Sequence, residues 1–112
     1  MSEALLERMR RVKLMIFDVD GVLTDGTLYY GDNGAELKAF NARDGHGIKM
    51  LQESGVEVAI LSARRARAVD VRAAELGITL VEQGIADKGR AFDSLIVRAH
   101  ALPESAGYMG DD

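Results

Sequence analysis

The sequence contains no cysteine, few aromatic residues and fewer basic than acidic side chains. Without cysteine, disulfide bonds and thiolate metal sites are excluded, so packing alone must stabilise the fold. The formal net charge of -4 disfavours a nucleic-acid-binding role, because such domains usually carry a basic face. No stretch approaches the roughly 20 apolar residues of a membrane span, and residues 1–13 lack the apolar run of a secretory signal. We therefore expect a cytoplasmic protein.

Apolar segments of two lengths alternate along most of the chain. Short apolar runs predict strands at residues 13–17, 56–61, 79–81 and 106–109, and helical periodicity predicts helices at about 45–54, 64–76 and 88–99. Gly55 and Gly77 stand where helix C-caps are expected. Strands that alternate with helices imply βαβ crossovers, so we predict an α/β fold with one Rossmann-like parallel sheet covered by helices on both faces. Residues 1–112 fit a single domain.

Residues 27–40 do not follow this alternation. Two extended segments flank Asn33-Gly34, a dipeptide that tolerates the positive φ angles of a tight hairpin turn. We therefore predict a protruding β-hairpin over residues 27–40.

Polar side chains follow several of the predicted strands. Asp18 and Asp20 follow the first strand, Ser62 follows the second and Asp111 follows the last. In open α/β sheets, ligands bind beyond the carboxyl ends of the strands. These side chains therefore mark the edge where a binding site is expected.

The run Asp18-Val-Asp-Gly-Val-Leu-Thr-Asp25 is the most informative segment. Two carboxylates two residues apart at a strand end can face one crevice, and Gly21 allows the backbone to turn sharply. A solvated turn explains the run by itself equally well. A calcium loop does not, because glycine is fourth and Tyr29 stands where the twelfth-position glutamate belongs.

Three later residues extend this pattern towards phosphate chemistry. Ser62 could donate its hydroxyl and backbone amide to phosphate oxygens, Lys88 could place an ammonium beside the phosphate, and Asp111 could bind magnesium. Each also has a simpler explanation, with Ser62 as a helix cap, Lys88 as a solvated surface residue and Asp111 as part of a turn. Together they favour a phosphate site.

Four segments in this order resemble the successive motifs of the haloacid dehalogenase superfamily of phosphatases: DVDGVLTD, the serine in ILSAR, the lysine in DKGRAF and GDD. Within that superfamily the chain is most similar to the phosphatases that act on 3-deoxy-D-manno-octulosonate 8-phosphate. Those proteins have a short hairpin flap in place of a large cap domain, followed by an N-x-R-D-G-x-G-I element, which here occupies residues 41–48.

The resemblance implies a magnesium-dependent phosphatase that works through an aspartyl-phosphate intermediate in lipopolysaccharide sugar synthesis. Asp18 would attack phosphorus, and Asp20 would protonate the leaving alkoxide and then deprotonate water. Lys88 would stabilise the phosphate. Asp18, the Asp20 carbonyl and Asp111 would surround Mg²⁺.

The resemblance also implies which residues bind the phosphorylated sugar acid. Arg64 is the first choice for the substrate carboxylate, because arginine binds carboxylates in two-pronged fashion and Arg64 follows the Ser62 loop. The full set of predicted phosphate- and substrate-binding residues is Asp20, Asn41, Arg43, Asp44, Gly45, Lys49, Ser62, Arg64, Arg72, Lys88 and Asp112.

Two alternative functions fit the same sequence features. A phosphatase for a related nonulosonate 9-phosphate would use the same chemistry, and a non-catalytic assembly module would use the hairpin edges for pairing. The resemblance implies a homotetramer. Family members continue beyond the fourth motif, and a chain that ended there would hold Asp111 on a frayed terminus. We therefore expect the catalytic assignment to describe a longer parent protein rather than these 112 residues alone.

Overall fold

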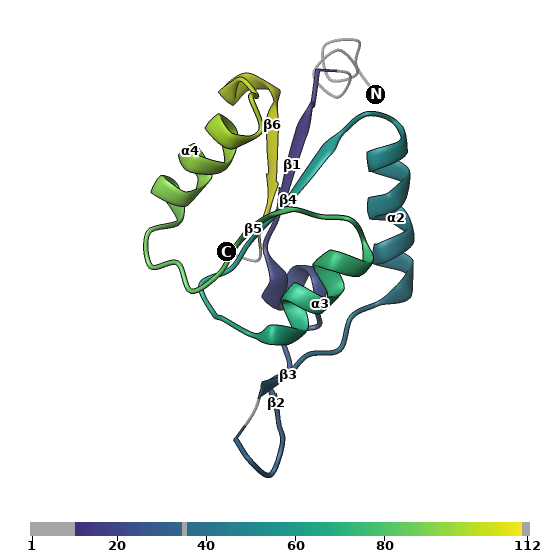
Figure 1. Cartoon of the computed structure of the whole chain (residues 1–112), viewed down its shortest axis with the longest axis vertical. Coiled ribbons are helices and arrows are strands. Elements are labelled where there is room, and N and C mark those ends of the chain that lie inside the picture. The colour runs from purple at the N-terminus through teal and green to yellow at the C-terminus, as the bar shows by residue number, and fades with distance from the viewer. Residues whose placement is uncertain (1–10, 35, 111–112) are drawn as a thin grey trace.

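A computed structural model describes residues 11–34 and 36–110 of the chain. Its main sheet consists of β1 (Leu14–Phe17), β4 (Glu57–Leu61), β5 (Leu80–Glu82) and β6 (Ala106–Met109). All pairings in this sheet are parallel, and the strand order is β5-β4-β1-β6 (Figure 1). The predicted α/β class is thereby confirmed.

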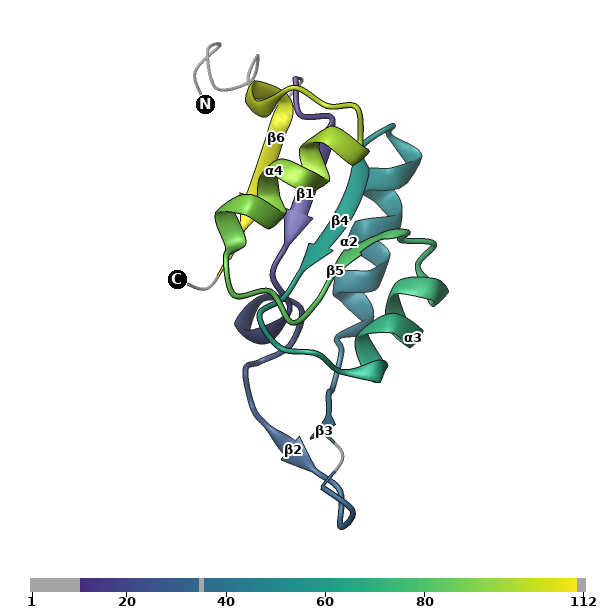
Figure 2. The ribbon, with the colours of Figure 1, turned by 60° about the vertical axis from the view of Figure 1, so that its left-hand side comes forward.

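Helices cover both faces of the sheet. Helices α2 (Ala42–Glu53) and α3 (Arg67–Glu75) lie on one face, and α4 (Lys88–Arg98) lies on the other (Figure 2). Side chains that alternate along the strands divide between two cores. Phe17 and Ile60 pack with the first pair of helices, whereas Ile16 and Leu61 pack with α4. This alternation explains why the central strands are apolar at successive positions.

The order of the strands reverses beside β1. From β1 the chain proceeds to β4 and then to β5, and it returns through α4 to place β6 on the other side of β1. A reversal of this kind opens a crevice at the carboxyl ends of the two strands that flank it. The residues that follow β1 therefore stand at the favoured position for a ligand.

A hairpin projects from the body beyond the carboxyl ends of β1 and β4 (Figure 1). It contains β2 (Tyr29–Tyr30) and β3 (Glu36–Leu37), which pair antiparallel, so the ladder is shorter than the predicted segment 27–40. The backbone N–H of Gly34 donates to the Gly31 carbonyl at 2.9 Å, and Gly34 has a φ of 82°. The turn thus spans more residues than the tight Asn33-Gly34 turn that we predicted.

Two helices begin at positions that differ from the prediction. Helix α2 starts earlier, because the Asn41 side chain accepts a hydrogen bond from the Arg43 N–H and caps it. Helix α3 starts at Arg67 and not at Arg64, because Ala66 is extended and its N–H donates to Gln83 Oε1 at 2.9 Å.

The ends of α2 and α3 follow the prediction. Gly55 and Gly77 take φ values of 91° and 71° directly after the helix C-caps, as expected of C-terminal glycines. A short 3₁₀ turn (Pro103–Ser105) precedes β6. Over residues 11–34 and 36–110, no helix is long and apolar enough to cross a membrane.

Candidate active site

Asp18 lies directly after β1 and begins a tight backbone turn. Residues Val19–Leu23 form this turn, and Gly21 adopts a φ of 84° within it. Thr24 Oγ1 accepts a 3.1 Å hydrogen bond from the Gly26 N–H on its far side. The Asp18 side chain is buried, and its Oδ1 accepts a hydrogen bond from the Val19 N–H at 2.7 Å. The turn and the hydrogen bond from Val19 therefore hold this carboxylate in one orientation at the strand end.

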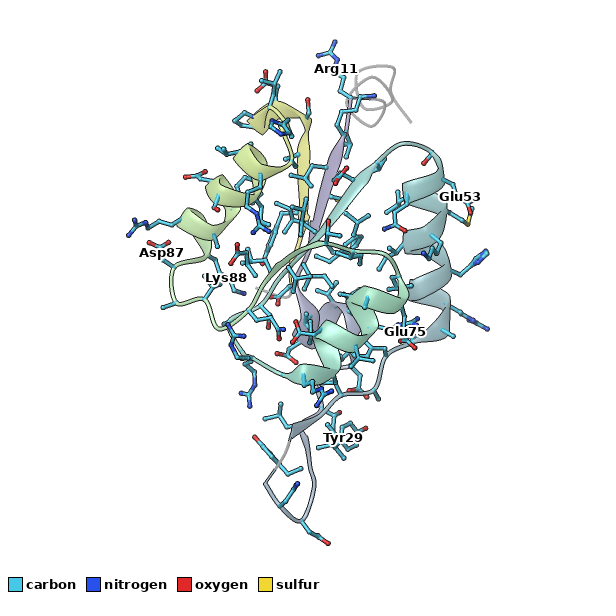
Figure 3. All side chains as sticks on the ribbon, viewed as in Figure 1. Arg11, Tyr29, Glu53, Glu75, Asp87 and Lys88 are labelled. Atoms are coloured by element: carbon cyan, nitrogen blue, oxygen red, sulfur yellow. The ribbon has the colours of Figure 1, made fainter. Side chains whose placement is uncertain are left out.

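Lys88 approaches Asp18 from the start of α4. Its Nζ lies 2.9 Å from Asp18 Oδ2, across 70 positions of sequence. Asp87 caps the helix by accepting a hydrogen bond from the Arg90 N–H at 3.2 Å, and this cap fixes where Lys88 leaves the loop (Figure 3). The Lys88 side chain is 34% exposed and that of Asp18 is 8% exposed, so the pair lies where a solute could reach it.

Asp20 has a different cationic partner. Lys38, which follows β3 at the base of the hairpin, places Nζ 2.7 Å from Asp20 Oδ1. Lys38 is not among the predicted site residues, because nothing in the local sequence distinguishes it from a surface lysine on an exposed strand. The two acids of the turn therefore each have a lysine, one from α4 and one from the hairpin.

Ser62 is completely buried after β4. Its backbone N–H donates to the Glu82 carbonyl at 2.8 Å, so the sheet already uses the amide that we predicted for phosphate binding. Its Oγ accepts a hydrogen bond from the Arg64 N–H at 3.3 Å. The hydroxyl is thus the donor of Ser62 that remains suited to a phosphate oxygen.

Arg64 reaches the hairpin. Its Nη2 donates to the Tyr30 hydroxyl at 3.3 Å, which links the loop after β4 with β2. A substrate carboxylate that bound this guanidinium would therefore lie under the hairpin.

Several of the predicted sugar-binding residues gather beside the turn that follows Asp18. Asn41 and Asp44 line a cavity of about 360 Å³ together with Thr24 and Asp25. Arg72 lies next to them, since a Cβ added at Gly45 would stand 2.2 Å from its Nη2. Helices α2 and α3 thus approach closely at Gly45, where a larger residue would displace the guanidinium.

The remaining predicted binding residues are more dispersed. Arg43 is the second residue of α2 and lines a mostly apolar depression with Phe17 and Met109. Lys49 lies near Gly77, the first residues of β4 and the residue that precedes β5, at the opposite end of the sheet from Asp18. The structure therefore does not bring Lys49 together with the Asp18–Lys88 pair, while Asp112 lies outside the described residues.

Asp25 closes the turn on its exposed side. Its Oδ1 accepts a hydrogen bond from the Thr27 N–H at 2.8 Å. This bond favours the charged carboxylate and holds the pKa of Asp25 below its ordinary value of 3.8.

Two of the three predicted metal ligands, Asp18 and Asp20, lie within the described residues. Within residues 11–34 and 36–110, no group of three His, Asp or Glu side chains is arranged to hold an ion. Asp111, the third predicted ligand, lies outside the described residues. The Asp18 N–H donates to the Met109 carbonyl at 2.9 Å, so β6 runs up to the level of Asp18. The Asp18 carboxylate and the Asp20 backbone carbonyl are hard oxygen donors, and such donors suit Mg²⁺.

Comparisons with known proteins give a consistent result. No family model matches the chain. It is 47% identical over 111 residues to the 3-deoxy-D-manno-octulosonate 8-phosphate phosphatase KdsC of Escherichia coli strain K12. The aligned region covers 99% of this chain and 59% of that protein. The chain thus spans about three fifths of the length of this curated relative.

Solved structures agree with the sequence match. A 3-deoxy-D-manno-octulosonate 8-phosphate phosphatase from Moraxella catarrhalis, in complex with magnesium, phosphate and KDO, superposes with a TM-score of 0.92 at 38% identity, covering 100% of this chain and 64% of that one. A putative HAD superfamily (subfamily III A) hydrolase from Legionella pneumophila superposes with a TM-score of 0.91 at 41% identity, covering 96% of this chain and 59% of that one. Sequence, fold and the order of the motifs agree, and the chain therefore belongs to the haloacid dehalogenase superfamily.

Proposed function

We propose that the protein containing this chain hydrolyses 3-deoxy-D-manno-octulosonate 8-phosphate to the free sugar acid and phosphate. The observation that carries this proposal is the 2.9 Å contact between Lys88 Nζ and Asp18 Oδ2 at the carboxyl edge of β1. A buried carboxylate with an ammonium beside it, at the strand end of such a sheet, suits nucleophilic attack on a phosphate ester.

In the first step, the Asp18 carboxylate attacks phosphorus and forms an aspartyl phosphate, while the bond between phosphorus and the ester oxygen breaks. A carboxylate and a phosphate dianion repel each other, and Lys88 offsets this repulsion where the charges meet. Asp20 donates a proton to the departing alkoxide. Asp20 then takes a proton from the water that attacks the aspartyl phosphate, and this second step releases phosphate and restores Asp18.

Magnesium fits the same oxygen atoms. The Asp18 carboxylate, the Asp20 carbonyl and Asp111 would hold it, and the bound ion would supply further positive charge against the phosphate oxygens. The relative from Moraxella catarrhalis binds a magnesium ion, which supports this choice of metal.

The sugar acid would lie between the hairpin and the turn after β1. Arg64 is suited to the substrate carboxylate, because its guanidinium already lies at the Tyr30 hydroxyl under the hairpin. Asn41, Asp44 and Arg72 would contact the sugar hydroxyls from the side of α2 and α3. A role in lipopolysaccharide sugar synthesis in the cytoplasm follows from this substrate.

Phosphate release by the full-length gene product tests the proposal. We expect magnesium-dependent release from the eight-carbon ester and a loss of at least about 1,000-fold in Asp18→Asn, because the nucleophile is removed. A preference for a nine-carbon ester would move the assignment to the nonulosonate phosphatases. If the wild-type protein hydrolyses neither ester, the proposed function is wrong.

The assembly role rests on a separate observation. Leu28, Tyr29, Tyr30 and Leu37 are 43–60% exposed on the hairpin, although apolar side chains of this size are usually buried. We propose that the hairpin packs against other copies of the chain in a homotetramer.

A further inference from the structure

The Lys38 side chain is almost completely buried, which is unusual for a lysine. Its side chain is 2% exposed, whereas that of Lys88 is 34% exposed. A lysine ammonium is rarely withdrawn from water unless a partner compensates the lost hydration. Asp20 Oδ1, at 2.7 Å, provides that compensation.

The pair joins two parts of the molecule that are not neighbours in sequence. Asp20 lies on the turn after β1, and Lys38 lies 18 residues later, where the chain leaves the hairpin for α2. Tyr30 and Arg64 form another polar link between the hairpin and the body. The hairpin is thus attached directly to one of the acids of the candidate site.

The two acids use different lysines. Asp18 Oδ2 faces Lys88, whereas Asp20 Oδ1 faces Lys38. The Asp20 carboxylate therefore has an orienting contact of its own, in addition to the Asp18–Lys88 pair. A carboxylate that must serve as acid and then as base needs such a fixed orientation, since proton transfer requires heavy atoms within about 3 Å.

We propose that Lys38 is a positioning residue for Asp20, which orients the carboxylate for proton transfer and connects the position of the hairpin with catalysis. This inference rests on the proposed function. Lys38 acts through Asp20 and does not touch the reacting atoms.

The test compares Lys38→Met with Lys38→Arg in the full-length gene product. On the sugar-acid ester, Lys38→Met should lower kcat by about 10- to 100-fold with KM within about threefold, because small misplacements of catalytic groups cost rates of this order. Lys38→Arg should recover most of the loss, since arginine can also donate to Asp20. Lys13→Met is the matched control, because Lys13 is exposed at the amino end of β1 and should leave kcat unchanged.

p-Nitrophenyl phosphate separates positioning from general damage to the fold. Its leaving group departs without a proton, so formation of the aspartyl phosphate should not need an oriented Asp20. Lys38→Met should therefore release a first-turnover burst of nitrophenolate at a rate within about threefold of wild type, followed by slow turnover. A variant that is merely misfolded would lose the burst as well.

Three results would overturn the inference. Full activity of Lys38→Met on the sugar-acid ester would overturn the inference and leave the proposed function intact. A burst slowed as much as kcat, in a variant whose melting temperature is unchanged, would do the same. An inactive wild-type protein would instead overturn the proposed function and the inference with it.

Discussion

Asp87 stabilises the start of α4 and thereby the position of Lys88. Replacing Asp87 with alanine removes the acceptor for the Arg90 N–H, and we expect the free energy of unfolding to fall by about 1 kcal/mol. Urea denaturation of the full-length gene product measures this change. Asp93→Ala is the matched control, because Asp93 is exposed within the same helix and caps nothing there. Equal losses in the two variants would contradict the capping role.

Gly45 and Gly47 lie two residues apart on α2 but differ in their surroundings. A Cβ at Gly45 would stand 2.2 Å from Arg72 Nη2, whereas a Cβ at Gly47 would meet nothing within 4 Å. Gly45→Ala should therefore displace Arg72. KM for the sugar-acid ester should then rise by about tenfold, because one charge-assisted hydrogen bond to the substrate is lost. Gly47→Ala should leave KM unchanged and raise stability by about 0.5–1 kcal/mol. An unchanged KM in Gly45→Ala would argue against a substrate contact at Arg72.

At the scale of single elements, the hairpin is the feature with the clearest external role. Replacing Leu28 and Tyr29 with serine should lower the native mass measured by light scattering, because their apolar side chains would no longer pack between copies. Val97→Ser is the control, since Val97 is 72% exposed on α4, away from the hairpin. If the hairpin variant keeps the wild-type mass, the hairpin does not hold the assembly together.

The boundaries of the elements show what a sequence can and cannot predict. Strand β6 and the start of α4 follow the prediction, because local apolar runs and the Asp87 cap determine them. The start of α3 does not, because Gln83 holds the Ala66 N–H from a distant part of the chain. Lys38 was missed for the same reason, since only the folded hairpin brings it to Asp20.

At the scale of the whole molecule, the parallel sheet accounts for the arrangement of the site. Asp18 and Lys88 are 70 positions apart in sequence, yet they meet because β1 and the loop into α4 end at the same edge. The sequence predicts this edge from the alternation of strands and helices. It does not predict that the Ser62 amide is used within the sheet, or that Lys49 lies at the opposite end, because both depend on the final packing.

Detection of a phosphorylated Asp18 would establish the covalent intermediate. The full-length gene product is mixed with the sugar-acid ester, quenched in acid within one turnover and reduced with borohydride, which converts an aspartyl phosphate to homoserine. We predict homoserine at position 18 in the peptide mass spectrum, and none in Asp18→Asn. An actively turning-over protein whose Asp18 remains unmodified under these conditions would contradict the assignment of Asp18 as the nucleophile.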